Sequence, residues 1–119
     1  MFKDVLRDVV ERTDGGIAGL LMGFDGIPVE NYVKGDLSVD VETVGMEYSV
    51  ILTQIIKAAK MLEAGEAREV AIQAEKVTTV IRLLNKDYFV ALTMAPQGNF
   101  GKGRFLLRTL TPKLLDDLL

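Results

Sequence analysis

The apolar residues from Val41 to Glu63 recur at the spacing of an α-helix, and this long helix constrains the fold more than any other segment. Two strand patterns precede it, at 17–24 and 28–33, and three follow it, at 68–75, 77–84 and 88–94. Short turn sequences such as Asp25-Gly26 separate the strands within each group, which predicts antiparallel hairpins. The long helix then connects the two groups and covers one face of their common sheet.

Helical patterns also stand at both ends of the chain. The first covers residues 2–12 and is followed by Gly15-Gly16, which favours a helix end because glycine adopts the left-handed conformation at no steric cost. The last begins after Asn99 and contains Pro112, so we expect either a kink there or a restart of the helix at Thr111-Pro112. These two helices are expected to cover the second face of the sheet.

The predicted fold is therefore a three-layer α/β/α sandwich of the α+β class, with a five-stranded, mostly antiparallel sheet. Its elements follow the order helix, two strands, helix, three strands, helix, within a single domain that spans residues 1–119. Asp40 or Ser38 is expected to cap the long helix, because either side chain can accept a hydrogen bond from a free backbone N–H.

The composition narrows the range of functions. The chain has no cysteine and no histidine, so thiol nucleophiles, the commonest general base and the commonest transition-metal ligand are missing. The net charge is −3 and no block of lysine or arginine occurs, which argues against a nucleic-acid partner. No apolar run approaches the roughly 18 residues of a membrane span, and the N-terminus is unlike a signal peptide. We therefore expect a cytoplasmic protein that does not insert into membranes, has no cofactor or bound metal, and is not an enzyme.

The long helix carries apolar residues on two of its faces. Nearly opposite the main stripe lie Met46 and Val50, the same row continues through Thr53 and Lys57, and Met61 lies beside it. Scattered apolar residues on a surface are ordinary, but a second copy of the helix could also pack against such a row, since methionine adapts to irregular gaps. The periodicity leaves both interpretations open. The main stripe, which is expected to face the sheet, consists of Val41, Val44, Tyr48, Ile51, Leu52, Ile55, Ile56, Ala59 and Leu62.

Gly45 interrupts this helix pattern with a residue that disfavours helices. Glycine in a helix interior costs about 1 kcal/mol relative to alanine. Either a neighbouring backbone comes close to Gly45 or the cost is simply tolerated, and the sequence leaves both explanations open.

The strand pattern at 68–75 alternates apolar and polar residues, as half-buried strands do. If this strand lies at the edge of the sheet, its free N–H and C=O groups invite pairing with another strand. A two-fold homodimer would then bury this strand, including Val70 and Ile72, in the same interface as the second apolar row of the long helix.

Two short motifs resemble those of a known family. The first hairpin contains Asp25-Gly26-Ile27-Pro28-Val29, and the last helix opens with Asn99-Phe100-Gly101-Lys102-Gly103-Arg104. With the long helix between them, they resemble the roadblock family, which includes dynein light chains and bacterial Mgl-type regulators. The resemblance covers nearly the whole chain and implies a dimer through the middle helix and the adjacent edge strand. Its structural residues here are Asp25, Gly26, Pro28, Asn99, Gly101 and Arg104.

The resemblance also implies a function. Such dimers bind Ras-like small GTPases, and the bacterial members resemble MglB, which regulates a polarity GTPase. We therefore expect a homodimeric adaptor that scaffolds or modulates the cycle of a small GTPase, in polarity or motility signalling of a bacterium. Two alternatives stay open: a small-molecule sensor, which needs a ligand-sized cavity, and a self-assembling scaffold without a GTPase partner.

Overall fold

The computed structural model describes residues 1–35, 37 and 39–118 and contains the predicted elements in the predicted order. Asp40 caps the middle helix, since its Oδ1 accepts a hydrogen bond from the backbone N–H of Glu42 at 3.2 Å. The alternative cap, Ser38, lies outside the described residues. The elements are α1 (Phe2–Arg12), β1 (Gly16–Gly23), β2 (Pro28–Val33), α2 (Val41–Met61), β3 (Glu69–Gln73), β4 (Thr78–Leu83), β5 (Tyr88–Met94) and α3 (Phe100–Leu118).

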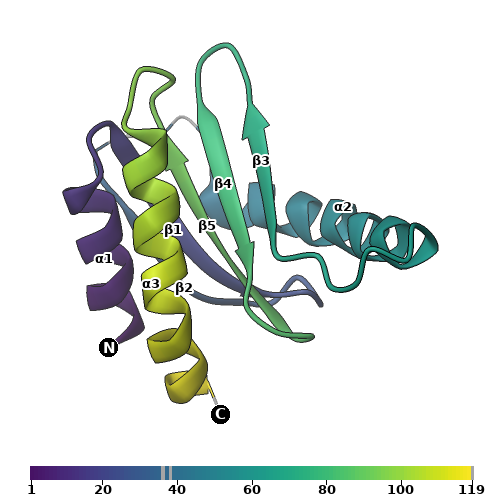
Figure 1. Cartoon of the computed structure of the whole chain (residues 1–119). Coiled ribbons are helices and arrows are strands. Elements are labelled where there is room, and N and C mark those ends of the chain that lie inside the picture. The colour runs from purple at the N-terminus through teal and green to yellow at the C-terminus, as the bar shows by residue number, and fades with distance from the viewer. Residues whose placement is uncertain (36, 38, 119) are drawn as a thin grey trace.

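The five strands form one sheet in the order β2-β1-β5-β4-β3, and every neighbouring pair is antiparallel. Helices α1 and α3 lie side by side on one face, and α2 crosses the other face (Figure 1). This arrangement confirms the predicted α/β/α sandwich. It also places β2 and β3 at the two edges of the sheet.

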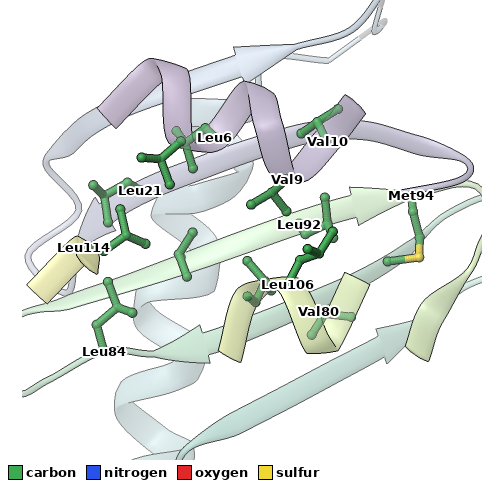
Figure 2. Close-up of a cluster of buried hydrophobic side chains, with 13 residues drawn as sticks. Leu6, Val9, Val10, Leu21, Val80, Leu84, Leu92, Met94, Leu106 and Leu114 are labelled. Carbon is green, nitrogen blue, oxygen red and sulfur yellow. The ribbon is translucent and has the colours of Figure 1, made fainter. Parts of the chain in front are cut away.

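Alternate residues of the central strands supply two separate cores, because successive strand side chains point to opposite faces. Under α1 and α3, Leu21, Leu92 and Val80 pack with side chains of both helices, among them Leu6 and Leu106 (Figure 2). Under α2, a smaller cluster consists of Leu20, Met22, Leu52, Ile81, Phe89 and Ala91.

Of the two alternatives expected at Pro112, a kink or a restart, the structure excludes the restart, because helix α3 continues through Pro112 to Leu118. Proline removes one intrahelical hydrogen bond. The hydroxyl of Thr111 donates to the carbonyl of Leu107 at 2.9 Å, and Leu114 beyond the proline stays buried in the core under α1 and α3. Packing on both sides of Pro112 therefore holds the helix in one piece.

A polar contact ties α1 to the edge strand β2. The hydroxyl of Tyr32 donates to Glu11 Oε1 at 2.5 Å, and Lys34 Nζ lies 3.3 Å from Glu11 Oε2. The hydrogen bond from Tyr32, with a smaller contribution from Lys34, lowers the pKa of the Glu11 carboxyl. The same hydrogen bond raises the pKa of Tyr32.

Candidate protein-interaction surface

Helix α2 makes a close contact with the sheet at Gly45. A Cβ atom at this position would lie 2.3 Å from Leu20 Cδ2 and 2.9 Å from Met22 Cε, both closer than normal contact. Gly45, Ser49 and Leu52 are the buried residues of the helix. The close approach explains the glycine, although the neighbours are side chains of β1 and not a backbone.

The row predicted to lie opposite the sheet is exposed, and we call Met46, Val50, Thr53, Lys57 and Met61 the α2 row. Met46, Val50 and Met61 expose 53%, 61% and 81% of their surface. The hydroxyl of Thr53 donates to the carbonyl of Ser49 at 2.9 Å, so its hydrogen-bonding need is met within the helix. The α2 row therefore offers mostly apolar contact area.

Two residues assigned to the sheet-facing stripe are exposed instead: Ile51 at 47% and Leu62 at 78%. The sheet-facing side of α2 centres on Gly45, Ser49 and Leu52, which leaves Ile51 on the flank. Leu62 follows the C-terminal end of α2, which extends past β3 beyond the sheet (Figure 1). Exposed apolar residues therefore flank α2 on both sides. The apolar periodicity of the sequence predicts only the α2 row, and not the exposure of Ile51 and Leu62.

Strand β3 lies at the edge of the sheet, as the dimer prediction requires. Leu83 N–H donates to the carbonyl of Arg68, and Ala74 N–H donates to the carbonyl of Val77, each at 2.9 Å. Because hydrogen-bonding direction alternates along an antiparallel strand, the even-numbered residues of β3 bond to β4. The residues whose N–H and C=O groups point to the free edge are Glu69, Ala71 and Gln73.

The side chains of Val70 and Ile72 lie on the α2 side of β3. Both are half-buried and pack against the cluster that contains Leu52 and Ile81. Their contribution to a dimer stays a prediction. In the structure they attach the edge strand to the core under α2, while Ala71 on the other face of β3 is exposed.

No family model and no curated protein matches the sequence, but solved structures do. MglC from Myxococcus xanthus is 41% identical over 98% of both chains, with a TM-score of 0.70. The chain belongs to the Roadblock/LC7 family. A Roadblock/LC7 domain from Streptomyces avermitilis has a TM-score of 0.77 at 12% identity, with 95% of this chain and 97% of the other covered. An MglB with a tetrameric arrangement has a TM-score of 0.85 at 16% identity, with coverages of 93% and 82%.

The first roadblock motif forms the turn between β1 and β2. Asp25 Oδ1 accepts a hydrogen bond from the N–H of Ile27 at 3.0 Å, and Gly26 has a φ of 84°, which disfavours other residues. Pro28 is the first residue of β2, an edge strand that tolerates its missing N–H. The motif therefore shapes the hairpin between β1 and β2.

The second roadblock motif starts α3 and fixes it to β3. Asn99 Oδ1 accepts a hydrogen bond from the N–H of Lys102 at 3.0 Å, which caps the helix in the turn that contains Gly101. Arg104 Nη2 lies 2.7 Å from Glu69 Oε2, and Arg82 Nη1 lies 3.8 Å from Glu69 Oε1. Two guanidinium groups thus hold one carboxylate beside the free edge of the sheet.

The described part of this Roadblock/LC7 chain contains no group of three His, Cys, Asp or Glu side chains that could hold a metal ion. Within the same residues, no helix is long and apolar enough to cross a membrane.

Proposed function

We propose that this chain acts in the cytoplasm as a homodimeric adaptor, which binds a Ras-like small GTPase and scaffolds or modulates its cycle. The observation that carries this proposal is the 41% identity to MglC over 98% of both chains, together with the exposed α2 row. The roadblock resemblance implies that family members work on small GTPases. Any GTP hydrolysis would use the residues of the GTPase, which this protein would help to position.

The α2 row and the edge of β3 suit one two-fold interface. Helix α2 extends past β3 (Figure 1), so a second chain that pairs with β3 would meet this end of α2. Antiparallel pairing centred near Ala71 satisfies the outward N–H and C=O groups of both strands. Val50, Met61 and Leu62 would lose exposed apolar surface, which is worth about 25 cal/mol per Å².

The helix part of this interface is tested by Met46→Glu, which places a charge in the α2 row. We expect a monomer, because an unpaired carboxylate is costly to bury, and light scattering coupled to gel filtration measures the mass. Phe105→Glu is the matched control, since Phe105 is 49% exposed on α3, on the opposite face of the sheet. It should leave the dimer intact. A folded Met46→Glu dimer would exclude the α2 row from the interface.

The strand part is tested by Ala71→Pro, which removes an N–H that points to the free edge and leaves the bonds to β4 in place. We expect at least about tenfold weaker dimerisation in sedimentation equilibrium, equivalent to about 1.4 kcal/mol. Ala71→Val keeps the N–H and should dimerise like the wild type. Equal dimerisation of both variants would show that β3 does not pair between chains.

The GTPase part is tested by a pull-down with the tagged protein from native cell extract loaded with GDP or with a non-hydrolysable GTP analogue. Stronger retention of a small GTPase with one nucleotide would support the regulator function and would show which nucleotide state of the GTPase the protein prefers. No retained GTPase in an extract shown to contain one would favour the alternative, a self-assembling scaffold.

A further inference from the structure

A cavity of about 200 Å³, partly open to solvent beside the exposed Val39, lies between the N-terminal half of α2 and the sheet. Its floor lies on two neighbouring strands, where Ala18 pairs with Thr93 and Leu20 pairs with Ala91. Val44 and Tyr48 of α2 form one wall, and Val39 from the β2–α2 connection forms another. The space exists because alanine and threonine side chains are too short to fill the layer between β1, β5 and the helix.

The chemistry of the walls is nearly uniform. None of the described residues that line the cavity is charged, and most are aliphatic. The polar side-chain atoms are three hydroxyls in a row, with Tyr48 Oη and Thr93 Oγ1 each 3.4 Å from Thr79 Oγ1. Hydrogen bonds between hydroxyls are normally about 2.7–2.8 Å long, so this row retains capacity for a further partner.

We propose that this cavity binds a small, uncharged, mainly apolar molecule that carries one hydroxyl or carbonyl group. An apolar cavity of about 150 Å³ binds benzene in another protein, so about 200 Å³ holds a molecule of roughly seven to nine non-hydrogen atoms. An ion inside the cavity would lose hydration without meeting an opposite charge on the described lining, which disfavours charged ligands. The single polar group of the ligand bonds to the hydroxyl row, and its apolar part contacts Val44 and Ala91.

A bound molecule would touch both the sheet and α2, and would therefore stabilise the packing of the helix that also carries the α2 row. This site does not depend on a GTPase partner or on the dimer. If the protein is a small-molecule sensor, this cavity on the α2 side of the sheet is where the molecule would bind.

The test uses three probes of similar size: benzyl alcohol, toluene and benzoate. Thermal unfolding measures stabilisation, and amide shifts in ¹H–¹⁵N NMR spectra locate the site. Benzyl alcohol at ten times its Kd should raise Tm by about 4–6 °C and shift the amides of Ala18, Ala91 and Thr93. Toluene should shift the same amides with lower affinity, and benzoate should shift none of them.

Three variants distinguish binding in the cavity from chance effects on folding. Ala18→Leu fills the cavity and should abolish both neutral probe signals, whereas Ala64→Leu, at an exposed site after α2, should leave them unchanged. Thr93→Val removes one of the three hydroxyls at nearly constant volume and should lower the affinity for benzyl alcohol toward that for toluene. The proposal is overturned if neither neutral probe shifts the cavity amides, if binding survives Ala18→Leu, or if benzoate binds as well as benzyl alcohol.

Discussion

Two helices cover one face of the sheet and a single helix crosses the other (Figure 1). The packing beneath them differs, and Figure 2 shows the cluster under the two helices. The larger core lies under α1 and α3 and joins side chains of both helices to β1, β4 and β5. Under α2 the core is smaller, a cavity of about 200 Å³ remains, and apolar side chains flank the helix on its exposed sides. The first face carries the larger core, and the second carries the cavity and the exposed apolar residues on which the proposed interactions rest.

The largest expected effect compares a buried leucine on the first face with an exposed isoleucine on the second. Leu107→Ala should lower the free energy of unfolding by about 3–4 kcal/mol, because it leaves a cavity in a filled core. Ile51→Ala on α2 should cost less than about 1 kcal/mol, since Ile51 is partly in contact with water already. Urea denaturation at a fixed protein concentration measures both values, and equal losses would contradict the proposed contrast.

The second comparison uses two glycines at which helices meet the sheet. A Cβ at Gly103 of α3 would lie 2.7 Å from Met94 Cε, and one at Gly45 of α2 would lie 2.3 Å from Leu20 Cδ2. Leu20 also lines the cavity and has space to move, whereas Met94 lies in the filled core.

Gly103→Ala should therefore cost about 2 kcal/mol through overpacking. Both substitutions gain the same helix propensity, so the difference must come from the space beside the new methyl group. Gly45→Ala should cost less than about 1 kcal/mol, because Leu20 can move toward the cavity that it lines. The urea midpoints of the two variants, measured under the same conditions, show which substitution destabilises the protein more. A larger loss at Gly45 would mean that the α2 side is packed as tightly as the other.

The sequence predicted the elements and layers because apolar periodicity records which face of each helix and strand is buried. It failed for Ile51 and Leu62, since a helical wheel gives the direction of a side chain but not the point at which the sheet beneath it ends. The sequence also could not explain why a glycine stands at position 45, because the explanation depends on contacts with Leu20 and Met22 of β1.

Other features of the candidate surface depend on pairing that sequence patterns do not record. Strand β3 lies at the edge of the sheet, and its register with β4 directs the N–H of Ala71 outward. The alternation of apolar residues in the sequence points instead to Val70 and Ile72. The cavity needs Ala18, Thr79 and Ala91 to meet under one helix, and these residues come from three different strands.

The smallest expected effect concerns the contact that ties α1 to β2, on the densely packed face. The pKa of Glu11 is lowered in the folded protein, chiefly by the hydrogen bond from Tyr32. Its contribution to stability is therefore present above the unfolded-state pKa near 4.5 and is lost as the pH falls through the folded value. The pKa of Tyr32 is raised, so the same contact also weakens as the pH rises through that value.

Tyr32→Phe should remove the larger part of this dependence and leave the part due to Lys34, so the decrease in Tm between pH 7 and pH 3 should be smaller than in the wild type. Tyr88→Phe removes a phenol hydroxyl at the start of β5 and should keep the wild-type decrease. The contact is exposed, and solvent screens such interactions, so the difference should be small beside the effects of Leu107→Ala and Gly103→Ala. An unchanged decrease in Tm between pH 7 and pH 3 in Tyr32→Phe would show that the hydrogen bond from Tyr32 to Glu11 contributes no measurable stability.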